Sequence, residues 1–295
     1  MQLIFFRQYK FENKSNFMSS KLSSVTAISL LWLIMLINTK IMHAQELEVD
    51  VPFVATPNEV VQEMLEIAKA GEGDYVIDLG SGDGRIVIEA AKRGAVGHGV
   101  DIDPDLVELS MERAKEETVD DRVMFKVEDI FETDFSMATV VTIYMSPGVN
   151  RQMRPIFFEQ LEPGTRVISH VFGMGNWAPD QETRVGRHHI YKWVIPADAS
   201  GEWKWKTAGQ EFQIYVGQTF QKIDDADFMP LTYDQPWTAT EATLAGERIV
   251  LLAENSRENL RHVYSGTIHG DQISGFVQIH ENGLYRTKKW TAFRN

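Results

Sequence analysis

The feature that most constrains this chain is a glycine-rich turn between an apolar run and a helix-like segment, in the sequence VIDLGSGDGRIVIEA that begins at Val76. The apolar run predicts a buried parallel strand, because such runs bounded by glycines suit strands covered on both faces. Gly80 and Gly82 lack the Cβ atoms that would prevent a sharp bend and a close approach to a ligand. The segment after Gly84 has the periodicity of a helix packed on a sheet. The turn therefore predicts a ligand-binding crevice at the strand ends of an α/β sheet.

Two acidic residues near this turn indicate the kind of ligand. Asp78 precedes the first glycine, where its charge would repel a pyrophosphate, and the G-x-G-x-G spacing is shorter than the dinucleotide G-x-G-x-x-G. Asp78 suits instead a ligand that carries an ammonium group and no phosphate. Asp101 lies in a second apolar run, about twenty residues beyond the turn, where a carboxylate can accept both ribose hydroxyls. A cation bearing adenosine satisfies both acids.

These segments resemble the motifs of a known class of enzymes. DLGSGDG at 78–84 and GVDIDP at 99–104 resemble the first two motifs of the class I S-adenosylmethionine (SAM)-dependent methyltransferases. The resemblance covers most of residues 52–196. It includes VED at 127–129, similar to the motif whose acid faces the adenine, and VTIYMSP at 141–147, similar to the segment bordering the transferred methyl.

A narrower resemblance exists within this class. The turn at 80–87, the run at 144–161 and the segment at 166–177 are similar to small lysine methyltransferases of mitochondrial membrane carriers. They are also similar to exported bacterial relatives that carry an added β domain. The resemblance implies SAM as the cofactor, and the following residues as its binding site: Asp78, Gly80, Ser81, Gly82, Asp101, Ile102, Glu128 and Asp129.

The resemblance also implies separate roles within this cofactor site. Asp78, Gly80 and Gly82 would hold the methionine portion, and Asp101 would hold the ribose hydroxyls. Either Glu128 or Asp129 would contact the adenine amine. A solvated strand end is the alternative interpretation of these last two acids.

Methyl transfer from a sulfonium is an in-line displacement that mainly requires positioning and in some cases a base. Tyr144 is a candidate to place its ring against the sulfonium or the acceptor nitrogen, a contact worth on the order of 1 kcal/mol, with plain packing as the alternative. His170 is the candidate imidazole base, with a buried structural role as the alternative. Phe172 and Trp177 are candidates for the wall of the acceptor pocket. The N/D-P-P-Y signature of methyltransferases acting on bases is missing, so adenine and glutamine acceptors are not favoured.

Composition narrows the function further. The 295-residue chain has a formal net charge of -13, so it lacks the electrostatic footprint of a nucleic-acid binder. It has no cysteine, which excludes disulfides, thiolate zinc sites and a cysteine nucleophile. His188 and His189 are adjacent in a predicted strand and point to opposite faces, so no metal site is predicted. Arg85 is expected to pair with a nearby carboxylate.

Strands that alternate with helices predict an α/β fold for residues 45–197, a doubly wound, Rossmann-like parallel sheet. Asp103 is predicted to cap the helix that starts at Pro104, and Thr56, Pro57 and Glu59 to form a capping box for the first helix. The expected strands are 76–79, 96–102, 123–127, 140–145, 165–172 and 188–195. The last of these is expected to be antiparallel at the sheet's edge or to reverse under the fifth strand.

The two ends of the chain differ from this central domain. Residues 198–295 alternate with a period of two between hairpin turns, which predicts an antiparallel barrel or sandwich of about seven strands with an accessory role. Residues 1–44 have a basic start, a short apolar core and small residues near Ala44, which is a signal-peptide pattern. We therefore expect an exported protein, periplasmic or secreted, or one anchored to a membrane through this segment. Met18 is an alternative initiator.

The sequence thus predicts a SAM-dependent methyltransferase whose acceptor, a protein lysine or a small molecule, is undetermined. The alternative is an exported, non-catalytic protein that binds an adenosyl ligand or a partner, since no SAM supply is evident outside the cytoplasm. A nicotinamide oxidoreductase is not favoured, because Asp78 and the short glycine spacing are unsuited to a dinucleotide.

Overall fold

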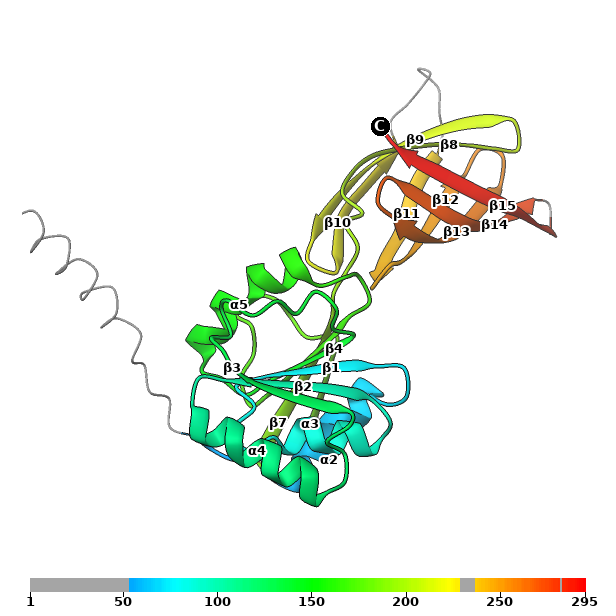
Figure 1. The fold of residues 1–295 in the computed structure, drawn as a ribbon. Helices are drawn as coiled ribbons and strands as arrows, with labels where there is room; N and C mark the ends of the chain where they lie inside the picture. The colour runs from blue at the N-terminus through cyan, green and yellow to red at the C-terminus, as the bar shows by residue number, and fades with distance from the viewer. Residues whose placement is uncertain (1–52, 229–236, 282) are drawn as a thin grey trace, which may run out of the picture. The chain divides into compact units, whose positions relative to one another are not determined.

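The computed structural model describes residues 53–228, 237–281 and 283–295, which form two β-sheets with helices around the first (Figure 1). The predicted signal peptide or anchor, residues 1–44, lies outside the described residues. Within the described ranges, no helix is long and apolar enough to cross a membrane.

The first sheet has seven strands in the order β3-β2-β1-β4-β5-β7-β6. Strands β1 to β5 are parallel, and β7 runs antiparallel to both β5 and β6. The strand order reverses on either side of β1, so the crevice of a doubly wound sheet lies at the carboxyl ends of β1 and β4. The strands are β1 Tyr75–Leu79, β2 Val96–Asp101, β3 Val123–Val127, β4 Val140–Ile143, β5 Arg166–His170, β6 Gln181–Val185 and β7 His188–Val194.

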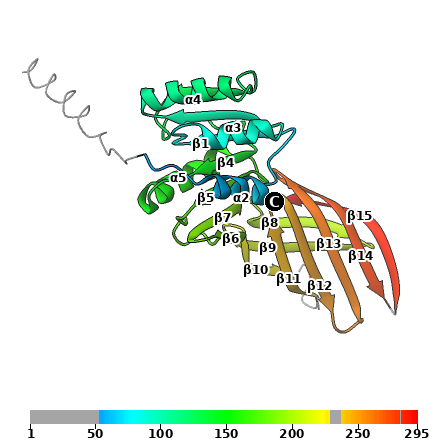
Figure 2. The same cartoon turned by 90° about the horizontal axis from the view of Figure 1, so that it is seen from below.

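Helices cover both faces of this sheet, as the predicted α/β architecture requires (Figure 2). The helices are α2 Asn58–Ala68, α3 Arg85–Lys92, α4 Pro104–Glu116 and α5 Pro147–Gln160. On one face α2 and α3 pack on β1, β4 and β5, while α5 buries Met153 and Phe157 against the other face. Val107 and Ala114 of α4 pack with α3 and with Phe125 of β3. The glycine turn between β1 and α3 therefore lies between a buried strand and a helix packed on the sheet.

The amino end of α2 differs from the prediction. Pro57 is the capping residue and no side chain caps the helix, so the predicted capping box was wrong. The Thr56 hydroxyl is instead within hydrogen-bond distance of His170 Nδ1, at 3.2 Å. A tertiary contact has replaced the local one. The cap of Asp103 was predicted correctly, because its side chain accepts a hydrogen bond from the Asp105 amide at 2.9 Å.

The edge of the first sheet also differs from the prediction. The strand expected at residues 188–195 is antiparallel, but it lies inside the sheet, since β6 pairs along its outer side. No strand was predicted at Gln181–Val185, because this segment is half exposed and lacks an apolar alternation. The backbone hydrogen bonds to β7 can hold this edge strand although none of its side chains is buried.

The second sheet consists of eight antiparallel strands in the order β10-β9-β8-β15-β14-β13-β12-β11, one more than the approximate number predicted. The end strands β10 and β11 lie beside each other, so the sheet curls towards a barrel. Its interior is rich in aromatic side chains, among them Trp203, Trp205 and Tyr264. The strands are β8 Gly201–Thr207, β9 Gln210–Thr219, β10 Lys222–Phe228, β11 Trp237–Ala245, β12 Arg248–Asn255, β13 Leu260–His269, β14 Gln272–Glu281 and β15 Leu284–Arg294.

Candidate active site

The glycine turn is fixed to the neighbouring strand by its backbone. The amides of Gly80 and Ser81 both donate to the Val100 carbonyl of β2, at 2.9 and 2.8 Å. Gly80 and Gly82 have φ angles of +76° and +53°, in the left-handed region that strains any residue with a side chain. A Cβ atom at Gly80 would also overlap Met145 Cε. The predicted need for glycine at this turn thus has two causes, conformation and close approach.

Asp101, the predicted ribose ligand, lies directly against this turn. Its Oδ2 accepts a hydrogen bond from the Gly82 amide at 2.8 Å, and its Oδ1 accepts one from the Asp103 amide at 3.0 Å. The side chain of Ile102, next to it, is 63% exposed and offers an apolar surface at the open end of β2. The carboxylate is therefore held in place by backbone donors and keeps lone pairs for a ligand.

Asp78 is the buried acid of the site, with 3% of its surface exposed. Burial raises its pKa to about 7, the negative charges of Asp101 and Asp83 add to this increase, and a hydrogen bond from Thr142 Oγ1 opposes it. That hydrogen bond is 2.6 Å long. A buried carboxylate without a neighbouring cation fits an ammonium group, which the amino acid end of SAM would supply.

Asp83, inside the same turn, is paired with arginine side chains of the protein instead. It accepts hydrogen bonds from Arg85 Nε at 2.8 Å and Arg85 Nη2 at 2.6 Å, and it also pairs with Arg113 of α4. Burial favours a higher pKa for Asp83, but the hydrogen bonds and charges of the two arginines outweigh burial and hold the pKa below its usual value. The prediction that Arg85 pairs with a nearby carboxylate is confirmed.

Glu128 and Asp129 lie at the end of β3, beside Asp101. The Glu128 amide donates to the Asp101 carbonyl at 3.0 Å, which places the two strand ends together. Asp129 Oδ1 accepts a hydrogen bond from the Phe131 amide at 2.9 Å. Asp78, Asp101 and Glu128 thus follow one another across β1, β2 and β3 at the same edge of the sheet.

Three rings gather at the ends of β4 and β5, and we call Tyr144, His170 and Phe172 the aromatic cluster. The Tyr144 ring centroid lies 4.1 Å from that of His170 and 6.3 Å from that of Phe172, with which it is stacked. Trp177 was also expected at the acceptor wall, but it is buried against Phe158 and Trp193, 4.7 and 5.7 Å away between ring centroids. Three of the four predicted acceptor-side residues therefore lie together, and the large indole of Trp177 fills the core instead.

His170 is completely buried, and both of its ring nitrogens have protein partners. Nδ1 lies 3.2 Å from Thr56 Oγ1, and Nε2 lies 3.0 Å from His188 Nδ1. Burial, followed by the nearby His188, lowers the pKa of His170 to about 4, so the imidazole is neutral at neutral pH. A proton from an acceptor can reach this imidazole only through one of its partners.

His188 and His189 diverge, as strand alternation predicts. While His188 faces His170, His189 Nδ1 lies 2.8 Å from Glu182 Oε1 on the neighbouring β6. Across the described residues, no group of three His, Cys, Asp or Glu side chains could hold a metal ion.

Sequence reasoning missed two buried polar residues, Asn150 behind the aromatic cluster and Thr142 beside Asp78. Asn150 of α5 donates through Nδ2 to Ser169 Oγ at 3.1 Å and to the Phe172 carbonyl at 3.0 Å. Thr142, which binds Asp78, was also missed, although the register of β1 with β4 pairs these two residues. Only the pairing of distant segments could have identified them.

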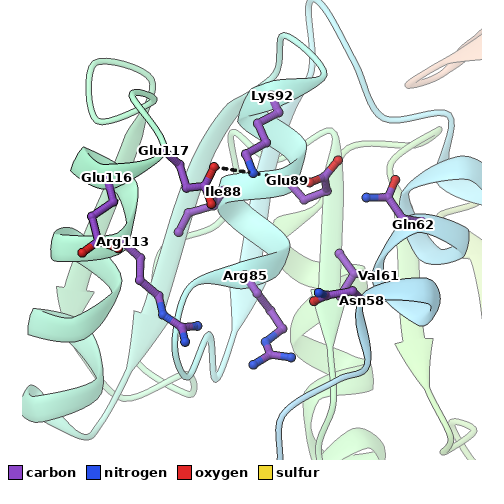
Figure 3. Close-up of a pocket in the computed structure, with 10 residues that line it drawn as sticks. All are labelled: Asn58, Val61, Gln62, Arg85, Ile88, Glu89, Lys92, Arg113, Glu116 and Glu117. Carbon is purple, nitrogen blue, oxygen red and sulfur yellow. Dashed lines mark ion pairs between the residues drawn. The ribbon is translucent and has the colours of Figure 1, made fainter.

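A separate cavity of about 460 Å³ lies between α2, α3 and α4 (Figure 3). It is lined by Asn58, Val61, Gln62, Arg85, Ile88, Glu89, Lys92, Arg113, Glu116 and Glu117. Its charges offset one another, as in the ion pair between Lys92 Nζ and Glu117 Oε2 at 2.8 Å. None of the predicted site residues lines it, so it is distinct from the crevice at the strand ends.

Comparison with known proteins yields matches to methyltransferases. The model of the ANTKMT methyltransferase domain family matches residues 78–181. A protein-lysine N-methyltransferase of Saccharolobus islandicus is 40% identical over 151 residues, which are 49% of this chain and 94% of that protein. A lysine N-methyltransferase of Homo sapiens, named for a component of ATP synthase, is 32% identical over 57% of this chain and 72% of its own length.

A solved structure also matches about half of the chain. It is an RNA methyltransferase from Salinibacter ruber in complex with S-adenosyl-L-homocysteine, with 53% identity and a TM-score of 0.49. The match covers 49% of this chain and 95% of that one. The family model ends before the second sheet begins at β8.

Proposed function

This chain belongs to the protein-lysine N-methyltransferase family of class I SAM-dependent methyltransferases, and from this premise we propose that its acceptor is the side-chain amine of a protein lysine. It is a SAM-dependent methyltransferase whose cofactor site is the crevice at the ends of β1 to β3. The observation that carries the lysine proposal is the aromatic cluster beside that crevice, in which Tyr144 contacts both Phe172 and the buried His170.

The cluster suits a lysine for two physical reasons. Aromatic faces attract a cation, so they can receive the ammonium group and the aliphatic stem that precedes it. Desolvation among rings then lowers the pKa of the lysine, because the charged form is disfavoured away from water. The free amine, the only form with a lone pair for attack, becomes more populated at neutral pH. The neutral imidazole of His170 adds no positive charge to repel the approaching lysine.

Different residues of the chain would bind SAM and orient the acceptor. Bound SAM supplies a methyl group on a positively charged sulfur. Asp78 would hold its ammonium group, Asp101 its ribose and Glu128 or Asp129 its adenine, while Tyr144 orients the acceptor for in-line attack. The amine nitrogen forms the new bond to carbon as the carbon–sulfur bond breaks, and the proton lost by the lysine leaves before the attack.

The proposal is tested by identifying the methylated residue directly. The protein is incubated with tritiated SAM and a protein extract, and the labelled products are hydrolysed to amino acids. We expect the label in ε-N-methyllysine. Label in RNA added to a parallel reaction, or in another amino acid, would reject the lysine proposal. SAM binding without any transfer would instead favour the non-catalytic alternative.

The proposed setting of this activity comes from the amino-terminal segment. The apolar core and small residues of residues 1–44 support export or membrane anchoring of the protein. The second sheet is proposed to be an accessory domain that gathers the acceptor or another partner. A fractionation experiment with the full chain, followed by sequencing of the mature amino terminus, tests both the destination and the cleavage.

A further inference from the structure

A strained turn follows β5 inside the aromatic cluster. Val171 has a φ angle of +68°, an outlier for a β-branched residue. The Phe172 amide donates to the His170 carbonyl at 2.9 Å, so the three residues form a tight turn of a rare and strained kind. The turn connects two members of the cluster directly, His170 and Phe172. Its shape therefore determines how these two rings are presented to Tyr144.

Hydrogen bonds from three elements hold this turn. The Phe172 carbonyl accepts from Ser169 Oγ at 2.7 Å and from Asn150 Nδ2 at 3.0 Å. The Val171 amide donates to the His189 carbonyl of β7 at 2.8 Å. Asn150 and Ser169 are both completely buried. The strained conformation persists because its surroundings over-determine it, which is a typical property of functional sites.

The amide of Asn150 has only one possible orientation. A carbonyl oxygen can only accept hydrogen bonds, so the Asn150 nitrogen must face Phe172. Its Oδ1 is then buried and finds no hydrogen-bond partner among the described residues. An unpaired buried acceptor lowers stability. This arrangement is unfavourable for the fold alone, which indicates a role in the site.

We propose that Asn150 and Ser169 are positioning residues that clamp the Val171 turn and so set the orientation of the Phe172 ring against Tyr144, the aromatic surface offered to the acceptor. The inference rests on the proposed function in placing the lysine at this cluster. Neither residue contacts the glycine turn, so the clamp acts on the acceptor and leaves the cofactor site unchanged. Because Ser169 Oγ also accepts a hydrogen bond from Asn150 Nδ2 at 3.1 Å, losing either side chain removes one bond to the Phe172 carbonyl and one support of the other donor.

The test uses the full chain with Ser169→Ala and a matched control, Thr165→Val. Thr165 precedes β5 and donates through its buried hydroxyl to the Ala138 carbonyl at 3.2 Å, at the far end of the same strand. Hydrogen exchange of the segment 166–177 reports the turn, since the amides of Val171 and Phe172 are both bonded. We expect at least tenfold faster exchange there in Ser169→Ala, and no change at this turn in Thr165→Val.

Kinetics then separate positioning from general destabilisation. We expect Ser169→Ala to lower kcat/KM for the lysine acceptor about tenfold and to leave the Kd for SAM within twofold, with recovery in Ser169→Thr. Asn150→Ala serves as a second variant with the same expectation. Three results for Ser169→Ala would overturn the proposed clamp: faster hydrogen exchange over the whole sheet, a loss of SAM affinity equal to the loss of kcat/KM, or unchanged hydrogen exchange at residues 171–172. If the unaltered protein methylates no lysine, the proposed function fails while the exchange result still decides the clamp.

Discussion

The proposed cofactor half of the site, at the ends of β1 to β3, and the proposed acceptor half, at the ends of β4 and β5, differ in the chemical groups that line them. At the ends of β1 to β3, backbone amides and carboxylates surround the glycine turn, and Asp78 and Asp101 accept from hydroxyl and backbone donors. At the ends of β4 and β5, the half-buried rings of Tyr144 and Phe172 and the buried ring of His170 determine the shape, and the polar groups behind them bond to one another. In the proposed function, charged and backbone groups would recognise SAM in the first half, and the shape of the aromatic cluster would recognise the acceptor in the second. Changes in each half should affect different constants.

The largest effect is expected from Asp101→Ala in the cofactor half. The substitution removes the proposed ribose acceptor and frees the Gly82 amide, and each hydrogen bond to a charged group is worth about 1.5 to 3 kcal/mol. We expect the affinities for SAM and S-adenosylhomocysteine to fall about 100-fold, as measured by calorimetry. Asp103→Ala, which removes only the cap of α4, is the matched control. Unchanged affinity in Asp101→Ala would contradict the ribose assignment.

The affinity for SAM should depend on pH through the ionisation of Asp78. Its pKa is about 7 in the free protein, and a bound ammonium group would lower it, so the cofactor binds the ionised form. Affinity should therefore be constant above pH 7 and fall about tenfold per pH unit below it, with proton uptake linked to release. Calorimetry at pH 6, 7 and 8 checks this dependence. Asp78→Asn should abolish it, and a pH-independent affinity in the unaltered protein would contradict this role.

In the acceptor half, stability should depend on pH through His170. Its folded pKa of about 4 lies below the value of 6.5 for an unperturbed histidine, so the unfolded chain binds the proton more tightly. The contribution to stability is complete above pH 6.5 and is lost as the pH falls from 6.5 towards 4. Between pH 7 and pH 5.5 we expect the contribution of His170 to the free energy of unfolding to drop by about 1 kcal/mol.

Denaturant titration of His170→Gln should show this contribution removed. His262 in the second sheet, whose pKa is also lowered to about 4 by burial and by His280, provides the control. His262→Gln should remove only the contribution of His262 to the pH dependence of the free energy of unfolding and leave that of His170 in place. An identical pH profile for His170→Gln and the unaltered protein would show that the imidazole is not held neutral.

The smallest effect is expected at Tyr144. Replacing its ring by leucine removes an aromatic face worth about 1 kcal/mol to a cation, so kcat/KM for the acceptor should fall about fivefold. The Kd for SAM should stay within twofold, and Tyr144→Phe should retain most of the activity. Steady-state kinetics with varied acceptor measure the change. A loss of SAM affinity in Tyr144→Leu would place this ring in the cofactor half instead.

The two halves also differ in how far the sequence predicted them. In the proposed cofactor half, the sequence predicted the glycine turn between strand and helix and the Asp103 cap, because these are local patterns, while the ligand contacts of Asp101 stay a prediction. In the acceptor half, the contact between Thr56 and His170 joins residues 114 positions apart, and the Asn150–Ser169 pair joins two elements 19 positions apart. No local pattern reports such pairs. The capping box was wrongly predicted for this reason, since Thr56 had a stronger partner in the tertiary structure.

Met145 links the two halves, since its Cε fills the space that a side chain at Gly80 would need. A ligand bound over the glycine turn would restrict Met145 and, through the adjacent peptide, Tyr144. The aromatic cluster would then reach its final arrangement only after the methyl donor has bound. In kinetic terms, we expect an ordered reaction in which SAM binds first and S-adenosylhomocysteine leaves last.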